Sequence, residues 1–287
     1  ENFEMEDASN HVLMNPVGVA GLITPWNLPL YLLSWKIAPA IAMGNTVVAK
    51  PSELTPMTAD LLAKTLVEIG LPKGVINIIH GYGAEAGQAI VEHPHVRLIS
   101  FTGGTETGRV VAGTASRMFK KLSLELGGKN SSIIFADADM EETIPEVARA
   151  GFLNQGQVCL CGSRILVERS IHDIFLKRFS QFVSEMNLGD PADESTQLGS
   201  LVSKEHREKV ESYIQIAKSE GAVLTIGGDR PSLGEPFDSG AFLRPTVISG
   251  LDTSSRCSTE EIFGPVVVVH PFDSEEEAVT IANGTEY

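Results

Sequence analysis

One cysteine lies in a setting that suits a nucleophile. Cys159 follows the polar, glycine-containing run Asn-Gln-Gly-Gln-Val, which begins just after a predicted helix ends near Gly151. Loops of this kind place reactive side chains at the edge of a rigid scaffold, and a cysteine thiolate readily attacks carbonyl carbons. The alternative is a buried cysteine with a structural role, which is the commoner fate of a lone cysteine. The loop alone leaves both interpretations open.

Two further side chains could assist such a nucleophile. Glu125 lies near the end of the apolar run Leu-Ser-Leu-Glu-Leu, where desolvation would raise its pKa and suit it to general-base catalysis. The alternative is an edge glutamate that faces solvent. Asn27 lies between Pro25-Trp26 and Pro29, in a stiff turn where a fixed amide could donate to an oxyanion. An ordinary turn-forming asparagine would give the same pattern.

A charged segment follows the second predicted strand. Lys50 and Glu53 flank a proline and Ser52 at the carboxyl end of that strand, which is where α/β sheets bind ligands. A carboxylate there can accept hydrogen bonds from ribose hydroxyls, and a lysine can donate to ribose oxygens. The alternative is a capping sequence, in which Ser52 caps a helix that starts near Thr55.

Two more turns are candidates for binding. Gly103, Gly104 and Thr105 lead from a predicted strand into a predicted helix, an arrangement that places a helix N-terminus near a phosphate. The run differs from the usual dinucleotide fingerprint, and a simple tight turn would also explain it. Closer to the C-terminus, the run from Glu261 through Phe263 to a Gly-Pro pair indicates only a compact turn into a strand.

Alternating strands and helices are predicted to position these residues. Such alternation favours parallel sheets that are covered by helices on both faces, which is an α/β fold. The glycine pair Gly127-Gly128 lies between two predicted strands and suits a hinge where the chain changes sheets. The predicted strands span residues 17–24, 45–50, 75–80, 97–102, 122–126, 131–136, 164–168, 222–227 and 266–271. The predicted helices span residues 58–69, 84–92, 105–119, 140–151, 171–186, 204–220 and 274–282.

Composition and charge exclude several classes of partner. The chain has 287 residues and a formal net charge of −15, which repels phosphate backbones, so no nucleic-acid partner is expected. An anionic membrane surface is equally unsuitable, and no charge-free apolar run reaches the ~20 residues that span a bilayer. Three cysteines fit a reducing compartment rather than a disulfide framework. Cys159 and Cys161 lack zinc spacing and a second ligand pair, so no metal site is expected.

Six motifs, taken in order, closely resemble the aldehyde dehydrogenase superfamily, and the similarity covers essentially the whole chain. The resemblance implies a Rossmann-like, parallel-sheet cofactor domain followed by an α/β catalytic domain. It implies part of an oligomerisation arm at residues 1–14, a partial NAD-binding domain at 15–127 and a partial catalytic domain at 128–287. The motifs are Pro25-Trp26-Asn27, Lys50-Pro51-Ser52-Glu53, Phe101-Thr102-Gly103-Gly104, Glu125-Leu126-Gly127-Gly128-Lys129, Gly156-Gln157-Val158-Cys159 and Glu261-Ile262-Phe263-Gly264-Pro265.

The resemblance also implies roles for single residues. Cys159 looks like a nucleophile that forms a thiohemiacetal and then a thioester, Asn27 and the Cys159 N–H like the oxyanion hole, and Glu125 like the base that activates water. These roles imply NAD-dependent oxidation of an aldehyde to a carboxylic acid. A carboxylate at Glu53 would repel a 2′-phosphate, so NAD is favoured over NADP. The implied cofactor contacts are Trp26, Lys50, Ser52, Glu53, Gly103, Gly104, Thr105, Gly127, Glu261 and Phe263.

Within the superfamily, the chain looks most like the 2-aminomuconate- and 2-hydroxymuconate-semialdehyde dehydrogenases, which oxidise carboxylated unsaturated semialdehydes. Gly104 departs from the pattern, because many members have serine there, and one pyrophosphate contact is thereby in doubt. The family chain is much longer. We therefore expect a central part of such an enzyme, without the start of the cofactor domain and the C-terminal Pro-Phe-Gly-Gly segment.

The sequence also gives expectations for the cellular compartment and the oligomeric state, and it leaves two other functions to consider. No signal peptide is recognised at Glu1, so a cytoplasmic protein is expected, and the resemblance implies a homodimer or homotetramer that acts on a small-molecule aldehyde. The competing interpretation is a non-catalytic relative, whether structural and crystallin-like or a truncated inactive product. A third is a phosphorylating or CoA-dependent relative, which would deacylate by another nucleophile; the presence of Glu125 favours water instead.

Overall fold

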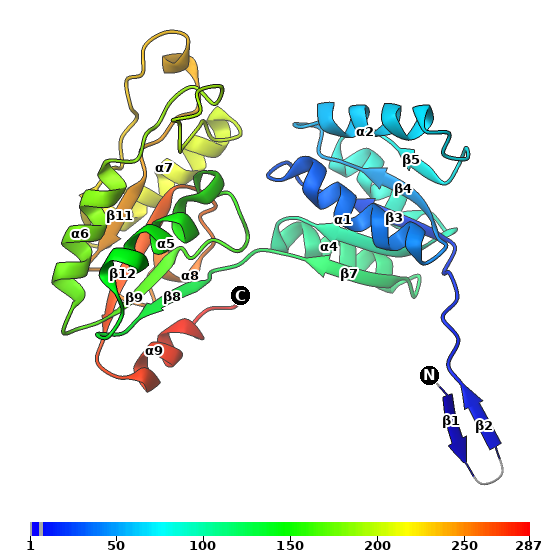
Figure 1. The fold of residues 1–287 in the computed structure, drawn as a ribbon, viewed down its shortest axis with the longest axis horizontal. Helices are drawn as coiled ribbons and strands as arrows, with labels where there is room; N and C mark the ends of the chain where they lie inside the picture. The colour runs from blue at the N-terminus through cyan, green and yellow to red at the C-terminus, as the bar shows by residue number, and fades with distance from the viewer. Residues whose placement is uncertain (1, 6–7) are drawn as a thin grey trace. The chain divides into compact units, whose positions relative to one another are not determined.

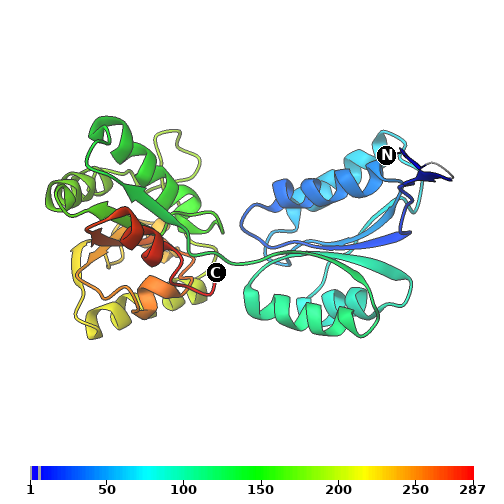
Figure 2. The same cartoon turned by 90° about the horizontal axis from the view of Figure 1, so that it is seen from below.

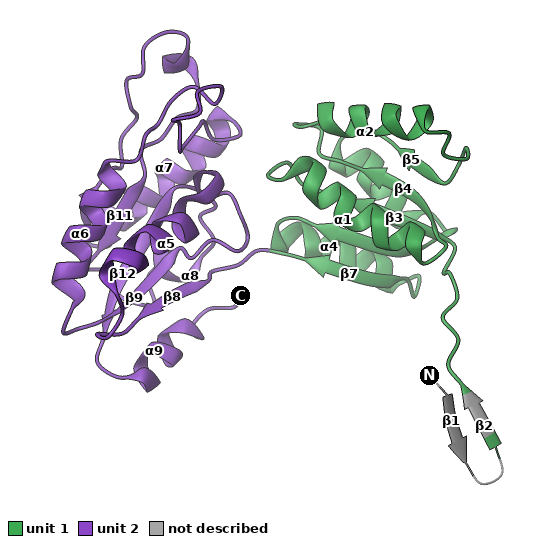
Figure 3. Cartoon of the chain, viewed as in Figure 1, with its two compact units in different colours: residues 1–126 green, residues 127–287 purple. Residues whose placement is uncertain are grey.

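Each half of the chain forms its own five-stranded sheet, and the computed structural model describes residues 2–5 and 8–287. The halves are two compact units, residues 1–126 and 127–287 (Figure 3). In each unit helices cover both faces of the sheet, which confirms the predicted α/β class (Figure 2). No helix in the described part of the chain combines the length and the hydrophobicity that crossing a membrane requires.

The start of the chain forms a separate hairpin, in which β1 (Asn2–Met5) pairs antiparallel with β2 (Ala8–His11). The predicted oligomerisation arm at residues 1–14 includes this hairpin. Residues 1, 6 and 7 of that arm lie outside the described residues. The arm's role in oligomerisation therefore stays a prediction.

The first unit has a fully parallel sheet with strand order β5-β4-β3-β6-β7. The chain runs outward from the central β3 to β4 and β5, then returns to the other side of β3 for β6 and β7 (Figure 1). This order reverses direction beside β3, as in dinucleotide-binding folds. The strands are β3 (Val19–Ile23), β4 (Thr46–Lys50), β5 (Ile76–Ile78), β6 (Val96–Thr102) and β7 (Lys121–Glu125), all of which were predicted.

Four helices cover this sheet. Leu33 and Ile37 of α1 and Ala59 of α2 pack on one face, while Ile90 of α3 and Val111 of α4 pack on the other. A π-helical turn at Gly83–Gly87 leads into α3, where a single helix was predicted. The helices are α1 (Pro29–Ala42), α2 (Met57–Glu68), α3 (Gln88–Glu92) and α4 (Thr105–Ser116).

Helix α1 begins where the sequence predicts only a stiff turn around Pro25 and Pro29. Pro29 occupies the first helical turn of α1, where the missing N–H is no loss and the fixed φ favours the helix. A second proline, Pro39, lies inside the same helix. The packing of Leu33 and Ile37 against the sheet offsets the break that Pro39 makes in the backbone hydrogen bonding.

The second unit has the strand order β10-β11-β12-β9-β8. The strands β11, β12, β9 and β8 are parallel, and only β10 runs antiparallel at the edge. Strand β12 is almost entirely buried at the centre, which fits its run of four valines. The strands are β8 (Ser131–Ile134), β9 (Arg164–Glu168), β10 (Val223–Ile226), β11 (Thr246–Ser249) and β12 (Val266–Phe272), of which β11 was not predicted.

The helices of the second unit also form two layers. Phe152 of α5 and Phe179 of α6 stack in the core on one face, with ring centroids 6.4 Å apart. Ile214 of α7 and Cys257 of α8 pack on the other face, and Ala278 of α9 packs against β9 and β12. The helices are α5 (Met140–Phe152), α6 (His172–Ser184), α7 (Lys204–Ser219), α8 (Arg256–Thr259) and α9 (Glu275–Ala282), with short 3₁₀ turns at Leu153–Gly156 and Phe237–Ser239.

Candidate active site

The candidate residues of the first unit gather at one edge of its sheet. Because all five strands are parallel, the loops that follow them leave from the same edge. The loops after β3, β4 and β6 carry Asn27, Glu53 and Gly104, and β7 ends at Glu125. In open α/β sheets this carboxyl edge, beside the point where the strand order reverses, is the place where ligands bind.

The loop after β3 is held close to the neighbouring strand. The Thr24 N–H donates to the Lys50 carbonyl oxygen over 3.1 Å, which extends the pairing of β3 and β4 by one residue. Trp26 and Asn27 follow as half-buried residues before α1 begins at Pro29. The helix and the strand therefore fix both ends of the short segment that carries the Asn27 amide.

Lys50 and Glu53 form an ion pair at the end of β4. The Lys50 side chain is only 3% exposed, and its ammonium donates to Glu53 Oε2 over 3.1 Å and to the Pro51 carbonyl over 3.0 Å. Partial burial opposes ionisation of Glu53, but hydrogen bonds from its own backbone N–H and from Lys50 lower the pKa of Glu53 overall. Glu53 is therefore a preformed, ionised acceptor at the sheet edge.

Ser52 does not cap a helix, which corrects the capping alternative. The Ser52 hydroxyl accepts from the Leu54 N–H over 3.2 Å, and α2 begins only at Met57, after Pro56. The segment between them is a turn rather than the first turn of a helix. Its polar groups therefore stay at the sheet edge beside Glu53.

The turn after β6 is shaped by its glycines. A Cβ on Gly103 would lie 2.5 Å from the ring of Phe101, so only glycine fits between that ring and the turn. Gly104 is the N-cap of α4, and a Cβ there would meet no atom within 4 Å. Gly104 has no side chain with which to cap the helix, and the helix begins at Thr105. The start of a helix that follows a strand in this way suits the binding of phosphate.

Of the two interpretations of Glu125, the structure of its unit agrees with the solvent-facing one. Strand β7 is the edge strand, and Glu125 at its end is exposed, as in the solvent-facing alternative. Lys36 of α1 lies within electrostatic reach of Glu125 and donates to the Ser100 hydroxyl over 2.7 Å. Burial lowers the pKa of Lys36 to about 8, and the charge of Glu125 works in the opposite direction. Nothing in the sequence pattern signalled this lysine.

The candidate residues of the second unit lie at the amino edge of its sheet, where the parallel strands begin. Residues 127–130 lead into β8, Cys159 lies in the loop before β9, and Glu261 and Phe263 lie in the loop before β12. These three strands are parallel, so the three loops meet at the amino edge of the sheet. The structure therefore places Gly127, Cys159, Glu261 and Phe263 together within this unit.

The backbone of the loop that leads to Cys159 is unusual. Asn154, Gln155 and Gly156 all have positive φ angles, of 50°, 56° and 71°. Strain of this kind in non-glycine residues persists only where the surroundings enforce it, and it is frequent at functional sites. Gly156 packs directly against the Gly264 carbonyl, so a side chain there would not fit. The loop of Cys159 and the loop of Glu261 are thus in contact.

Cys159 differs from the other two thiols of the chain. It is half-buried and lies in a turn that the Cys161 N–H closes by donating to the Val158 carbonyl over 3.0 Å. Cys161 and Cys257 are buried, and burial raises the pKa of each to about 11. Thiols with such pKa values stay protonated at neutral pH and are poor nucleophiles. Cys159 is therefore the most accessible of the three thiols.

Glu261 is tied to the chain segment that follows Glu125. Its Oε1 atom accepts from the Gly128 N–H over 3.1 Å, and Gly127 packs so closely on its carboxylate that a Cβ would clash. Burial raises the pKa of Glu261, against the hydrogen bond from Gly128 and the charges of two lysines. Phe263 follows with a positive φ of 62°, and its carbonyl oxygen lies 2.7 Å from His206 Nε2.

Lys129, in the same segment, is expected to destabilise the fold. Its Nζ atom has no hydrogen-bond partner among the described residues, and burial lowers the pKa of Lys129 from 10.5 to about 8. Between these two pH values the unfolded chain holds a proton that the folded chain has released, so stability rises with pH. We expect Lys129→Met to stabilise the second unit by about 1–3 kcal/mol at pH 7, and this gain to shrink between pH 8 and 10.5.

Urea unfolding of both proteins at pH 7 and pH 10 measures this difference. Lys177→Met is the matched control, because Lys177 is exposed on α6 and its replacement should change stability by less than about 0.5 kcal/mol at either pH. A Lys129→Met protein that is less stable than the wild type, or a gain that is the same at both pH values, would contradict the assignment.

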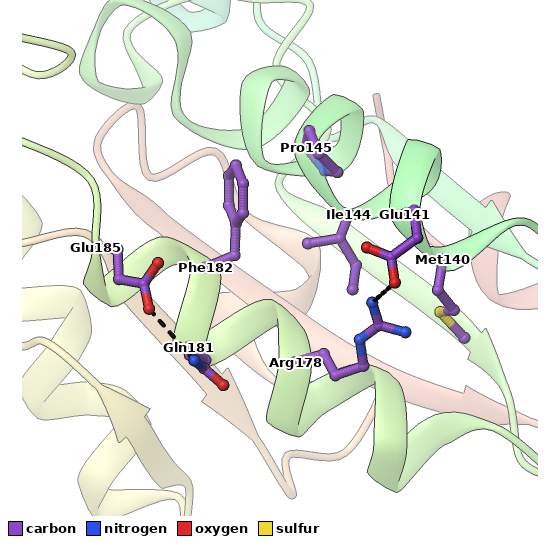
Figure 4. Close-up of a pocket in the computed structure, with 8 residues that line it drawn as sticks. All are labelled: Met140, Glu141, Ile144, Pro145, Arg178, Gln181, Phe182 and Glu185. Atoms are coloured by element: carbon purple, nitrogen blue, oxygen red, sulfur yellow. Dashed lines mark hydrogen bonds and ion pairs between the residues drawn. The ribbon is translucent and has the colours of Figure 1, made fainter.

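A cleft elsewhere on the second unit holds none of the candidate residues. It lies between α5 and α6, has a volume of about 270 Å³, and is crossed at its edge by an ion pair between Arg178 and Glu141 (Figure 4). Phe182, Ile144 and Pro145 form part of its apolar wall. The residues that line it include no thiol, hydroxyl or histidine. Across the described residues, no group of three or more acidic, histidine or cysteine side chains could hold a metal ion.

Comparison with known proteins identifies the family. The model of the aldehyde dehydrogenase family matches residues 1–287. A 2-aminomuconic semialdehyde dehydrogenase of Mus musculus is 54% identical over 97% of this chain and 58% of its own length. A 2-aminomuconic 6-semialdehyde dehydrogenase of Pseudomonas sp. is 48% identical over 98% of this chain and 57% of its own length. The chain thus spans somewhat over half the length of these relatives.

Solved structures agree with this result. A betaine aldehyde dehydrogenase of Staphylococcus aureus, crystallised with NAD⁺, has a TM-score of 0.92 and 48% identity, covering 95% of this chain and 54% of its own. A putative aldehyde dehydrogenase of Burkholderia cenocepacia has a TM-score of 0.96 and 43% identity, covering 100% of this chain and 59% of its own. With both sheets, the ordered motifs and the accessible cysteine accounted for, the chain belongs to the aldehyde dehydrogenase family.

Proposed function

We propose that the protein oxidises an aldehyde to a carboxylic acid with NAD, and that Cys159 is its nucleophile. The observation that carries the proposal is the placement of Cys159. It is the accessible thiol of the three, and it lies on a strained loop that contacts the loop of Glu261. A reactive cysteine needs access, a fixed backbone and neighbouring polar groups, and this setting supplies all three.

In the proposed reaction Cys159, Asn27 and Glu125 have different roles. The Cys159 thiolate attacks the aldehyde carbon, and the resulting oxyanion accepts hydrogen bonds from the Asn27 amide and the Cys159 N–H. NAD, when bound, accepts the hydride that this carbon releases, which leaves a thioester on Cys159. Glu125 then takes a proton from a water molecule, whose oxygen attacks the thioester and displaces the Cys159 thiolate. Aldehyde, NAD⁺ and water thus give carboxylic acid, NADH and a proton.

The residues at the edge of the first unit fit an NAD-binding role, and we propose that unit as the cofactor domain and the second as the catalytic domain. Lys50 and Glu53 offer a donor and an ionised acceptor for ribose hydroxyls. Trp26, Ser52 and the turn of Gly103, Gly104 and Thr105 would complete the contacts in this unit, and Gly127, Glu261 and Phe263 would supply them from the second unit. The glycine-containing turn that leads from β6 into the N-terminus of α4 is the observation that favours a bound phosphate.

Glu53 gives a prediction about cofactor choice. Because its carboxylate would repel a 2′-phosphate, we expect Glu53→Gln to lower kcat/KM with NAD and to shift the NADP/NAD ratio of kcat/KM upward by about tenfold or more. Steady-state assays with both cofactors measure this ratio. Glu68→Gln, at the exposed far end of α2, is the matched control and should leave the ratio unchanged. An unchanged ratio in Glu53→Gln would remove Glu53 from the cofactor site.

The proposed substrate is a 2-amino- or 2-hydroxymuconic semialdehyde, because relatives with those printed activities are 45–54% identical to this chain. An NADH assay of the protein at its natural length, over a panel that includes both semialdehydes, betaine aldehyde and acetaldehyde, tests it. We expect the muconic semialdehydes to have the highest kcat/KM. Equal or better kcat/KM with betaine aldehyde would contradict the substrate, and no NADH with any aldehyde would contradict the activity.

We also propose that the protein is cytoplasmic and acts as a homodimer or homotetramer. The buried thiols of Cys161 and Cys257 are compatible with a reducing compartment, where such groups stay unoxidised. The antiparallel hairpin of β1 and β2 offers strand edges of the kind that pair between subunits. Size-exclusion chromatography with light scattering would measure the number of subunits.

A further inference from the structure

The turn that carries Cys159 is held by a residue outside the motifs. Asn130 lies at the start of the second sheet, just before β8 begins at Ser131. Its side-chain amide Nδ2 donates to the Cys159 carbonyl oxygen over 2.7 Å and lies 3.5 Å from the Cys161 carbonyl oxygen. One amide therefore reaches two carbonyls of the same turn.

Gly128 packs closely against the same Cys159 carbonyl. A Cβ on Gly128 would lie 2.5 Å from the Cys159 carbonyl oxygen and 3.1 Å from Asn130 Nδ2. The φ angle of Gly128 does not lie in the positive range that favours glycine. The contact with the Cys159 carbonyl is therefore what excludes a side chain at this position. The same residue donates its N–H to Glu261. Residues 128–130 thus touch the Cys159 turn on one side and the Glu261 carboxylate on the other.

Fixing this carbonyl has a direct consequence for the thiol. The Cys161 N–H closes the turn from Val158, and the Asn130 amide fixes the peptide plane that follows the Cys159 α-carbon. With both constraints in place, the Cys159 backbone has little rotational freedom. The directions of its Cα–Cβ bond and of its N–H are then fixed together, and these set where the thiol and the oxyanion donor lie relative to each other.

We infer that Asn130 is a positioning residue for the nucleophile: it aligns Cys159 by holding the carbonyl of its turn. The inference rests on the proposed function for its catalytic meaning, but the contact itself lies within the second unit. Asn130 is exposed, and a single hydrogen bond of this kind contributes modestly, so the effect of losing it is of the order of tenfold rather than a complete loss of reaction.

The test compares Asn130→Asp, Asn130→Ser and Asn187→Asp with the wild type. Aspartate keeps the shape of asparagine but loses the donor, whereas serine keeps a donor. Asn187 is the matched control, because it is an exposed asparagine of the same unit whose amide donates to the Ser195 carbonyl over 3.1 Å, in a loop without candidate residues. Gly128→Ala is a second variant that displaces the same Cys159 carbonyl while the Asn130 side chain itself is kept.

Two readouts are needed. The first is the rate at which iodoacetamide alkylates Cys159, followed by mass spectrometry of the peptide, which requires neither aldehyde nor cofactor. The second is the NADH burst with its dependence on NAD concentration. We expect Asn130→Asp to slow alkylation and the burst by about tenfold with the KM for NAD unchanged, Asn130→Ser to recover part of both rates, and Gly128→Ala to slow both.

The outcomes separate this inference from the proposed function. Wild-type rates of alkylation in both Asn130→Asp and Gly128→Ala, or an equal slowing in Asn187→Asp, would overturn the role of Asn130. An active Cys159→Ala enzyme would overturn the proposed function instead, while the alkylation rates would still report on whether Asn130 holds the turn.

Discussion

Replacing Cys159 with alanine is expected to lower NADH formation by at least about 10⁴-fold, because no other group of the chain can form the thioester. The structure explains why neither of the other two thiols can substitute. Cys161 and Cys257 are buried, and burial raises the pKa of each to about 11, so both remain protonated at neutral pH. The measurement is steady-state NADH formation by the protein at its natural length with saturating aldehyde and NAD.

The matched controls are Cys161→Ala and Cys257→Ala, which each remove a thiol without removing the proposed nucleophile. Both should keep kcat within about tenfold of the wild type, since each replaces a small buried group and acts mainly through stability. Substantial NADH formation by Cys159→Ala would show that another group attacks the aldehyde. A loss as large in Cys257→Ala as in Cys159→Ala would show that the activity reports on folding instead.

Replacing Glu125 with glutamine is expected to reduce turnover by about 10²–10⁴-fold while leaving the first burst of NADH intact. Glutamine has nearly the shape of glutamate but cannot take a proton from water, so the thioester should form at its normal rate and then persist. Because Glu125 is exposed at the end of β7, the replacement should change stability little, and Lys36 keeps its hydrogen bond to Ser100. Rapid-mixing absorbance at 340 nm, set by the NADH chromophore, separates the burst from turnover.

The control for this variant is Glu92→Gln, which removes another exposed carboxylate of the first unit, one that accepts a hydrogen bond from Gln88. It should change neither the burst nor the turnover. A burst that disappears in Glu125→Gln would place Glu125 in the hydride-transfer step. Turnover equal to that of the wild type would remove Glu125 from the reaction.

Much of the fold follows from local patterns in the sequence. Buried strands such as Thr46–Lys50 and Val266–Phe272 are short apolar runs rich in β-branched residues, and the pattern identifies them. Helix α1 was missed because its two prolines suggest a break, although Pro29 favours the first helical turn. Strand β11 was missed because its four residues, Thr246–Ser249, give too short a pattern to distinguish from a loop.

For the candidate site too, local sequence predicted some features and not others. The ordered motifs identified the loops of Asn27, Glu53, Cys159 and Glu261, because each loop has a distinctive local sequence. The contacts between loops could not be predicted, since they join residues that are far apart in the chain. Asn130 reaches Cys159 across 29 positions, and Gly128 reaches Glu261 across 133.

The environment of Glu125 shows the limit of local reasoning. Its apolar neighbours suggested a buried strand, but the position of a strand within its sheet depends on pairing that the local sequence does not encode. Strand β7 lies at the sheet edge, so Glu125 is exposed within its unit. Lys36, which lies 89 positions earlier in the chain, interacts electrostatically with Glu125. A residue so distant in the sequence could not be found from the local pattern around Glu125.

The most direct test of the account is to trap the bond that it proposes. The Glu125→Gln protein is mixed with aldehyde and NAD, quenched in acid within the burst, digested and analysed by mass spectrometry. The account predicts an acyl group on Cys159 itself, distinguished from Cys161 by fragmentation of the peptide, in an amount equal to the NADH of the burst. A full NADH burst with an unmodified Cys159 peptide, or with the acyl group on Cys161, would contradict it.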